Sequence, residues 1–247
     1  MSLDPVCILA GGLGTRLGVL AAGRPKPLVS VAGEPFIFHQ LRLLGEHRAR
    51  RVIICVGYRG EQIESAVGDG RELGLEISYA YDGPQAAGTA GAVRGALPLL
   101  GRAFFVLYGD TYLRVDYQAV QRAFRASRRP ALMTVLRNDN RWDASNARFV
   151  PDGEGPSGQV TEYGKGEVNP HHQWIDYGLG MFTAEGFLDA STDTTDLAAV
   201  YRRLAERGEL AGFEANERFY EIGTAKSLAE TDAFLRREAS RRAKLPT

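Results

Sequence analysis

A glycine-rich loop directly after a short apolar run is the feature of this sequence that most limits its fold. The run Val6 to Leu9 is followed by residues 10–17, AGGLGTRL. Three glycines leave three positions of one short loop without a Cβ atom, so the backbone can adopt positive φ and bring its N–H groups close to a bulky anion. A strand that ends in such a loop is typical of α/β proteins that bind phosphate groups.

Two cations follow the glycines. Arg16 offers a fork of donors that suits phosphate oxygens, and Lys26 places a point charge between Pro25 and Pro27, which stiffen its loop. The loop is not a P-loop, because no Gly-Lys-Ser/Thr follows at the required spacing. It is not the dinucleotide fingerprint either, because its glycines are spaced differently and basic residues follow them. The sequence therefore predicts a polyphosphate site of another kind.

Strand-like and helix-like segments alternate through the first half of the chain. Hydrophobic periodicity predicts strands at 6–10, 51–56, 75–81 and 103–108 and helices at 35–47, 61–67, 88–97 and 117–126. The second half is richer in strands, which are predicted at 131–136, 147–150, 159–162 and 175–182, with helices at 197–207 and 225–236. Repeated β-α-β units predict a mostly parallel sheet with helices on both faces, and ligands at the carboxyl ends of its strands.

Composition excludes several classes of partner. The 247 residues are 44% hydrophobic, enough for one α/β domain with a full core, and the 30 basic residues balance 30 acidic ones. We therefore expect no nucleic-acid partner and only a local anion site. No apolar run approaches the roughly 18 residues of a membrane span, and Met1 to Pro5 carries no basic segment, so we expect no membrane association and a cytoplasmic protein.

The cysteines and histidines suggest no metal centre of their own. Cys7 and Cys55 lie in apolar runs and are predicted to be buried reduced thiols. His171 and His172 are adjacent in a polar stretch, which favours a solvated loop over a metal site.

The glycine loop, together with residues 24–28 (RPKPL), resembles the signature of sugar-1-phosphate nucleotidylyltransferases, L-A-G-G-x-G-T-R-L with a downstream P-K-P. The resemblance covers nearly the whole chain. It implies a nucleotide-diphospho-sugar transferase (Rossmann-like) fold, with a mixed, mainly parallel sheet of roughly seven strands and helices on both faces. It also implies a single domain over 1–247, with an NTP-binding half at 1–112 and a sugar-phosphate-binding half with a C-terminal helix at 113–247.

The implied reaction joins an NTP and a sugar 1-phosphate into an NDP-sugar and releases pyrophosphate, with Mg²⁺ as cofactor. Such a transfer needs in-line positioning of two anions and neutralisation of the leaving group. The resemblance assigns catalysis to three residues. Arg16 would hold the β- and γ-phosphates, Lys26 would neutralise charge at the α-phosphate, and Asp110 would ligate Mg²⁺ after a buried strand. A turn or helix cap is the alternative role for Asp110.

A second metal ligand is expected near the C-terminus. The family usually has W-x-D-x-G-T, and this chain has FYEIGT at 219–224. Glu221 therefore takes the position of the aspartate and Phe219 that of the tryptophan. A glutamate can also ligate Mg²⁺, and a structural cap is the alternative.

The nucleoside side resembles the family at residues 81–90, YDGPQAAGTA, although Gly88 and Thr89 also fit a plain turn before a helix. The complete set of residues predicted to bind the NTP is Leu9, Ala10, Gly11, Gly12, Gly14, Thr15, Arg16, Lys26, Tyr81, Asp82, Gln85, Gly88, Thr89 and Asp110.

The sugar-phosphate side is predicted from looser matches, and an ordinary surface lysine is the alternative for Lys165. Its residues are Gly109, Glu162, Lys165, Asp176, Tyr177 and Gly178. Residues 141–146 and 174–178 resemble the branch that activates D-glycero-D-manno-heptose 1-phosphate with GTP, which makes this pair the expected substrates. Trp142 fits either a packing anchor or a platform for the sugar.

Other functions stay open at this point. One is UTP-, dTTP- or CTP-dependent transfer to another sugar 1-phosphate or to a small phospho-alcohol or phosphonate. Another is a non-catalytic subunit that senses nucleotide sugars on the same fold. The sequence identifies no interface, and a homo-oligomer is compatible with it.

Overall fold

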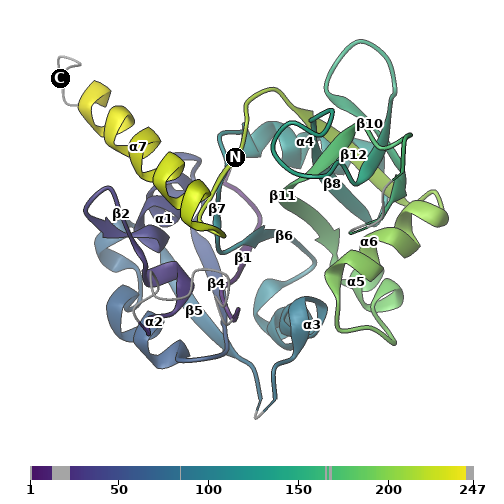
Figure 1. Ribbon diagram of the computed structural model, residues 1–247. Helices are drawn as coiled ribbons and strands as arrows, with labels where there is room; N and C mark the ends of the chain where they lie inside the picture. Colours follow the sequence, from purple (N-terminus) through teal and green to yellow (C-terminus); the bar gives the residue numbers. More distant parts are fainter. Residues whose placement is uncertain (1, 13–22, 84, 165, 167–168, 243–247) are drawn as a thin grey trace.

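The computed structural model describes residues 2–12, 23–83, 85–164, 166 and 169–242, and its centre is one nine-stranded sheet (Figure 1). In spatial order the strands are β5 (Glu76–Tyr81), β4 (Arg51–Val56), β1 (Val6–Leu9), β6 (Ala103–Tyr108), β11 (Trp174–Thr183), β8 (Ala131–Arg137), β12 (Leu210–Ala215), β10 (Ser157–Tyr163) and β9 (Ala147–Pro151).

The two halves of the sheet differ in strand direction. Neighbouring strands are parallel from β5 through β4 and β1 to β6, and again between β8 and β12. The pairs β6–β11, β11–β8, β12–β10 and β10–β9 are antiparallel. The parallel part is the part in which helices connect consecutive strands, because only a crossover can return the chain to the same end of the sheet. The expected mixed α/β fold is confirmed, but the sheet is not mainly parallel as expected, because the described neighbours form four parallel and four antiparallel pairs.

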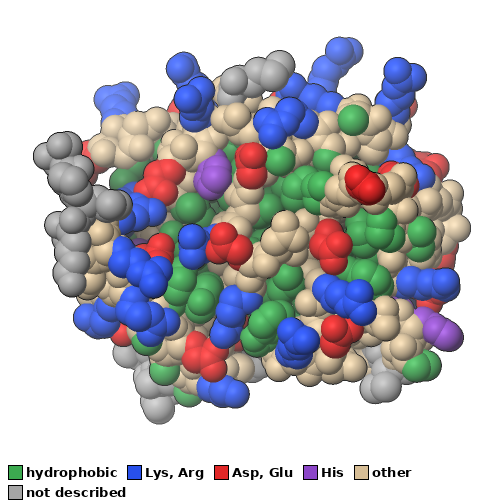
Figure 2. All heavy atoms as spheres, turned by 90° about the horizontal axis from the view of Figure 1, so that it is seen from above, with side chains coloured by type: hydrophobic (Ala, Val, Ile, Leu, Met, Phe, Trp, Pro, Cys, Tyr) green, Lys and Arg blue, Asp and Glu red, His purple; other side chains and the backbone are tan. Residues whose placement is uncertain are grey.

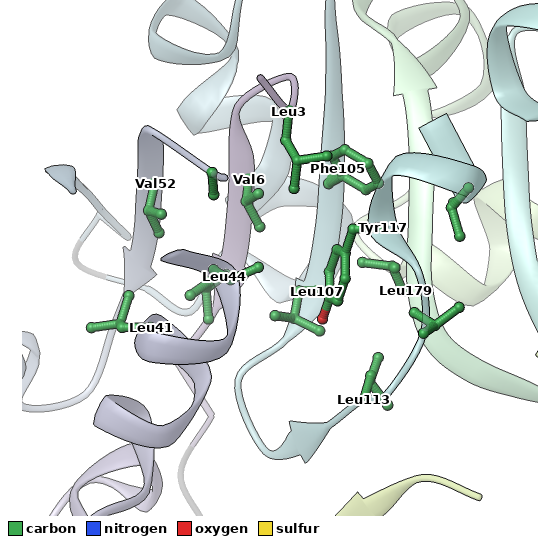
Figure 3. Close-up of a cluster of buried hydrophobic side chains, with 14 of the residues drawn as sticks. Leu3, Val6, Leu41, Leu44, Val52, Phe105, Leu107, Leu113, Tyr117 and Leu179 are labelled. Atoms are coloured by element: carbon green, nitrogen blue, oxygen red, sulfur yellow. The ribbon is translucent and has the colours of Figure 1, made fainter. Parts of the chain in front are cut away.

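Helices cover both faces of the sheet. One core cluster contains buried side chains of α1 (Phe36–Glu46), α2 (Gly60–Val67) and α4 (Tyr117–Ser127). The other contains buried side chains of α3 (Gly88–Leu100), α5 (Ala184–Ala190) and α6 (Leu197–Glu206). Alternation along β1 assigns Val6 and Ile8 to the first cluster and Cys7 to the second. Figure 3 shows Val6 among the side chains of the first cluster, with Leu41 and Leu44 from α1 and Phe105 from β6.

Two small ribbons and a last helix complete the described chain. The 3₁₀ turn η2 (Lys26–Leu28) precedes a ribbon of β2 (Ser30–Val31) and β3 (Glu34–Pro35). The second ribbon pairs β7 (Thr111–Tyr112) with β13 (Tyr220–Glu221). Helix α7 (Ala225–Arg242) packs on both ribbons through Phe234 and Leu235. A further 3₁₀ turn, η3 (Arg71–Leu73), precedes β5.

Each strand and helix predicted from the sequence is present. The structure also contains elements that were not predicted. Strand β12, with the sequence LAGFEA, was not expected because alanine and glycine favour strands weakly. It becomes a strand because it fits between β8 and β10. Helix α5 was also not expected; it is only seven residues long, and the hydroxyl of Thr183 accepts a hydrogen bond from the Gly186 N–H at its start. The sheet accordingly has nine strands instead of the roughly seven expected.

The two cysteines agree with the prediction, and one histidine does not. Cys7 and Cys55 are buried free thiols whose sulfur atoms lie 3.3 Å apart. The hydrogen bond with Cys55 and burial raise the pKa of the Cys7 thiol well above its usual value, which keeps it protonated. His171 is exposed, but the expectation of a solvated loop is wrong for His172, whose side chain is buried with its Nε2 3.8 Å from a Glu162 carboxylate oxygen.

The surface shows the charge balance expected from the composition. Basic and acidic side chains are interspersed on the face drawn in Figure 2. Among the described residues, no group of three or more His, Cys, Asp or Glu side chains is placed to hold a metal ion. None of the helices within the described ranges has the length and apolar character needed to cross a membrane. The division into an NTP-binding half and a sugar-phosphate half stays a prediction.

The close approach of β1 and β6 at their carboxyl ends depends on Gly109. Its N–H donates to the Leu9 carbonyl at 3.0 Å, and a Cβ atom at this position would lie 2.6 Å from the same oxygen. Any other residue must therefore push the two strand ends apart.

We expect Gly109→Ala to lower the free energy of unfolding by about 1–3 kcal/mol, as overpacking in a rigid core does, measured by urea denaturation. Gly95→Ala is the matched control, because a Cβ atom at Gly95 in α3 meets nothing within 4 Å. That change should leave stability unchanged or raise it by roughly 0.5–1 kcal/mol. Equal stability of the two variants would contradict the constraint at Gly109.

Candidate active site

A pocket of about 400 Å³ lies at the carboxyl ends of β1, β5 and β6. The loop after β1, the turn η2, the start of α3 and the segment before α7 also contribute to its wall. Nine of the residues predicted to bind the NTP line this one pocket: Leu9, Ala10, Gly11, Gly12, Lys26, Asp82, Gly88, Thr89 and Asp110. The structure thus brings together segments from Leu9 to Gly223, more than two hundred positions apart in the chain.

The first part of the glycine loop packs closely on its neighbours. The Ala10 N–H donates to the Cys55 carbonyl at 2.9 Å, which continues the sheet beyond β1. A Cβ atom on Gly11 would lie 3.2 Å from the Gly57 nitrogen and 3.4 Å from a carboxylate oxygen of Asp82. Gly11 is therefore required where three strand ends converge. Gly14, Thr15 and Arg16, also predicted to hold phosphates, lie outside the described residues.

The cation and the carboxylate predicted to be catalytic are in direct contact. Lys26 Nζ lies 2.5 Å from Asp110 Oδ2, an ion pair between residues 84 positions apart. The two side chains are 12% and 29% exposed, so the pair is shielded but open to a ligand. Lys26 is held in η2 between two prolines, and Asp110 follows β6 in a tight turn. The alternative of a simple cap for Asp110 is not seen, because its described side-chain partner is the Lys26 ammonium.

Glu221, near the C-terminal end of the chain, lies beside the turn that carries Asp110. On the β7–β13 ribbon Glu221 pairs with Thr111, and the Ile222 N–H donates to the Asp110 carbonyl at 3.0 Å. A Cβ atom on Gly223 would meet both the Glu221 carboxylate and, at 3.4 Å, Lys26 Nζ. Asp110, in the turn just before β7, and Glu221, on β13, are therefore neighbours close to the Lys26 ammonium group.

The donor set at this point fits a hard divalent cation. Glu221 on the ribbon and Asp110 directly before it offer carboxylate oxygens, the kind of ligand that Mg²⁺ prefers. One Glu221 oxygen also accepts the Gly223 N–H at 2.8 Å, so this carboxylate is both a local cap and a candidate ligand.

Two predicted nucleoside contacts lie away from the pocket lining. Tyr81 is half exposed, and its hydroxyl donates to the Glu64 carboxylate on α2. Gln85 is exposed and does not line the pocket. Asp82 does line it, and its carboxylate accepts from the Ala87 N–H at 3.3 Å.

Gly88 and Thr89 have a structural partner as well as a place in the pocket. A Cβ atom on Gly88 would lie 2.5 Å from the Thr195 carbonyl, and Gly88 has a φ of +71°. The Thr89 hydroxyl accepts the Leu197 N–H at 2.8 Å and lies 3.3 Å from the Asp196 carboxylate. Gly88 and Thr89 therefore do form the turn that begins α3, which was the alternative to a nucleoside contact. The Thr89 hydrogen bonds also join the starts of α3 and α6.

The residues predicted for the sugar phosphate are spread over a wider area. Gly109 lines the pocket, and Lys165 lies outside the described residues. Asp176 accepts the Gly178 N–H at 2.9 Å, and its other oxygen accepts the Tyr163 hydroxyl at 3.3 Å. Tyr177 is only 1% exposed and packs its ring against Phe219, so contact with a sugar would require those side chains to move.

Glu162 lies at the edge of this region. It accepts from Arg148 at 2.8 Å, and this bond holds the pKa of the carboxyl below its usual value. Trp142 is exposed, and its ring packs against Phe219 and the Arg218 guanidinium; the role of a sugar platform stays a prediction.

Sequence reasoning missed several contributors to the site. Tyr108 and Gly223 line the pocket, and Gln40 on α1 hydrogen-bonds the turn that carries Asp110. A polar residue on the apolar stripe of a predicted helix is a signal that could have identified Gln40.

The fold is of the α/β class, and its glycine-lined pocket lies at the carboxyl ends of the sheet strands. A family model described as "Nucleotidyl transferase" matches residues 6–238. This chain therefore belongs to the nucleotidyl transferase family, and the expected enzyme class is confirmed.

Two relatives illustrate the range of the family. The N-acetylmuramate alpha-1-phosphate uridylyltransferase of Neisseria meningitidis is 32% identical over 233 residues, which are 92% of this chain and 96% of that protein. The D-glycero-alpha-D-manno-heptose 1-phosphate guanylyltransferase of Campylobacter jejuni is 34% identical over 109 residues, 44% of this chain and 48% of that protein.

Solved structures confirm the fold. A putative glucose-1-phosphate thymidylyltransferase from Bacillus anthracis superposes with a TM-score of 0.79 at 21% identity, covering 94% of this chain and 95% of that one. HddC from Yersinia pseudotuberculosis superposes with a TM-score of 0.75 at 20% identity, covering 94% and 100%.

We expect Lys26→Ala to lower kcat by about 10²–10³-fold, because a preorganised charge at the reacting phosphate is lost. Stability should change little, since Asp110 keeps access to water. Turnover by pyrophosphate release and unfolding by urea measure the two effects. Lys226→Ala, at an exposed lysine of α7, is the control and should be neutral. Near-normal turnover of Lys26→Ala would refute the role of Lys26.

Proposed function

We propose that this protein transfers a nucleotidyl group from an NTP to a sugar 1-phosphate and releases pyrophosphate, with Mg²⁺ as cofactor. The observation that carries the proposal is the meeting of Lys26, Asp110 and Glu221 beside the glycine-lined pocket. A cation beside two carboxylates is what phosphoryl chemistry needs, because the reaction depends on positioning and charge neutralisation.

The chain's own residues supply binding and orientation. Backbone N–H groups of Gly11 and Gly12 would face the phosphates, with Arg16 adding charge at the β- and γ-phosphates. Lys26 would stabilise the charge that develops at the α-phosphate as the sugar phosphate attacks in line. Asp82, Gly88 and Thr89 would border the nucleoside along the wall formed by α3.

Asp110 and Glu221 would hold the metal ion. The ion would neutralise the phosphate oxygens and the leaving pyrophosphate. Lys26 forms an ion pair with one Asp110 oxygen, so the ammonium also helps to orient this carboxylate, and both residues line the pocket.

The acceptor side favours a neutral, hydroxyl-rich sugar. Tyr108 lines the pocket, and burial, followed by the nearby charge of Asp176, raises the pKa of its phenol well above the usual value. A protonated phenol and a carboxylate together donate to and accept from sugar hydroxyl groups, whereas a carboxylate repels an acidic sugar. D-glycero-D-manno-heptose 1-phosphate with GTP is therefore the first substrate pair to test. The partial similarity to the Campylobacter guanylyltransferase supports it.

UTP with N-acetylmuramate 1-phosphate is the second pair. It is favoured by the similarity to the Neisseria uridylyltransferase, which extends over nearly the full length of both chains. We place either reaction in the cytoplasm, where NTPs are available.

The deciding experiment measures pyrophosphate release with Mg²⁺ for five common NTPs against a panel of sugar 1-phosphates. The panel includes manno-heptose, N-acetylmuramic acid, N-acetylglucosamine, glucose and mannose, with choline phosphate as a small phospho-alcohol. Turnover with one pair, lost in Lys26→Ala, supports the proposal and identifies both substrates. Silence across the panel in protein that binds NTP would favour a sensing role.

We expect Asp110→Asn to abolish Mg²⁺-dependent turnover, and Glu221→Gln to raise the Mg²⁺ concentration for half-maximal activity about tenfold, because each loses a charged oxygen ligand. Titration of activity with Mg²⁺ measures both. Glu217→Gln is the matched control, because this exposed glutamate near the ribbon pairs with Arg114 instead. If Asp110→Asn only halves activity, Asp110 is not a metal ligand.

Glu221→Asp tests whether the departure from the family pattern matters. Little change or a loss in turnover is expected, since the glutamate side chain is already fixed by the Gly223 N–H. A large gain would indicate a decayed site.

A further inference from the structure

We propose that Gln40 is a positioning residue for the metal-binding part of the active site: its buried side-chain amide clamps the turn that carries Asp110. The inference rests on the proposed role of Asp110 as a metal ligand. Gln40 itself touches neither substrate nor metal and acts through the backbone.

Both N–H donors of the Gln40 amide bind the turn that carries Asp110. Gln40 Nε2 donates to the Tyr108 carbonyl at 3.0 Å and to the Thr111 carbonyl at 2.7 Å. Tyr108 and Thr111 are the residues on either side of Gly109 and Asp110. A single side chain, about 70 positions away in sequence, therefore holds both ends of the turn at once.

Packing does not explain a glutamine at this position. Gln40 is 1% exposed, and the other buried residues of α1, a helix that is described throughout, are all apolar: Phe36, Ile37, Leu41, Leu43 and Leu44. Gln40 Oε1 is buried and has no hydrogen-bond partner among the described residues. A buried acceptor without a hydrogen-bond partner lowers stability. A leucine or methionine would fill the same space without that penalty. The contribution of the amide is then its two hydrogen bonds.

The clamp also links the two charged partners of the site. The Val29 N–H donates to the Lys26 carbonyl, and the Phe36 N–H, the first of α1, donates to the Val29 carbonyl. The segment that carries Lys26 is thus bonded to the start of α1, and Gln40, one turn later, is bonded to the segment that carries Asp110. This chain of bonds sets the spacing between the Lys26 ammonium and the Asp110 carboxylate.

Other bonds keep the turn folded without Gln40. The Gly109 N–H donates to Leu9, the Ile222 N–H donates to Asp110, and the Thr111 hydroxyl donates to Tyr108. Loss of the amide should therefore leave the fold intact and loosen only the placement of the Asp110 carboxylate. Ion affinity should weaken, whereas nucleotide contacts at the glycine loop should not.

The test compares Gln40→Met with a matched control, Gln121→Met. Gln121 is also buried, at 3% exposure, and its amide also ties backbone segments together, through the Asp4 N–H and the Ser2 carbonyl. It lies on α4, and none of these contacts involves the site. Gln40→Leu is a second variant in case Gln40→Met does not fold.

Mn²⁺ is the probe, and its affinity is measured by electron paramagnetic resonance in the presence of a non-hydrolysable NTP analogue. We expect Gln40→Met to weaken Mn²⁺ binding about tenfold, as loss of an outer-shell partner does, with nucleotide affinity in the absence of metal unchanged. Amide hydrogen exchange at residues 109–112 should be faster. Gln121→Met should lower stability and change neither quantity.

Unchanged Mn²⁺ affinity in both Gln40 variants, or an equal loss in Gln121→Met, would overturn the inference. Failure of the proposed function has a different outcome: Asp110→Asn would then bind Mn²⁺ as tightly as the unmodified protein. If Asp110→Asn loses the ion and the Gln40 variants keep it, only the role of Gln40 is wrong.

Discussion

The site depends on how closely the carboxyl ends of β1 and β6 approach each other. The hydrogen bond from the Gly109 N–H to the Leu9 carbonyl joins the strand that ends in the glycine loop to the strand that ends in Asp110. Parallel neighbours bring both ends to the same edge of the sheet, and the absence of a Cβ atom at Gly109 lets them meet. The anion-binding backbone and the acidic turn become one pocket because of this contact.

The β7–β13 ribbon adds the second acidic residue. Neither strand belongs to the large sheet, and each is only two residues long. Their pairing nevertheless fixes Glu221 opposite Thr111, one residue from Asp110, and α7 packs on the ribbon. A contact between residues over a hundred positions apart places two carboxylates beside Lys26. This arrangement of carboxylates cannot form until both halves of the chain have folded.

The second half of the sheet arranges the residues predicted for the sugar phosphate through a change of strand register and through side-chain packing. A change of register in β11 between Asp176 and Gly180 leaves Gly178 with a φ of +99° and places the Asp176 carboxylate among the phenols of Tyr108, Tyr163 and Tyr201. Phe219, in place of the usual tryptophan of the family, packs between Tyr177 and Trp142. The residue that departs from the family pattern at 219 is thus part of an aromatic cluster.

The sequence by itself determined the elements and the chemistry of the first half. Periodicity located the strands and helices, because a strand buried on both faces reads as an apolar run and an amphipathic helix has one apolar stripe. The motifs identified Lys26, Asp110 and Glu221, because their residue types fit the chemistry of phosphate transfer. Only the tertiary structure decided which of these side chains meet. In the structure β12 is a strand, and Tyr81 and Gln85 do not line the pocket. Tyr177 is buried, and Gln40 hydrogen-bonds the turn that carries Asp110. Those outcomes depend on contacts between residues far apart in the chain. Local sequence patterns do not specify which distant residues come into contact.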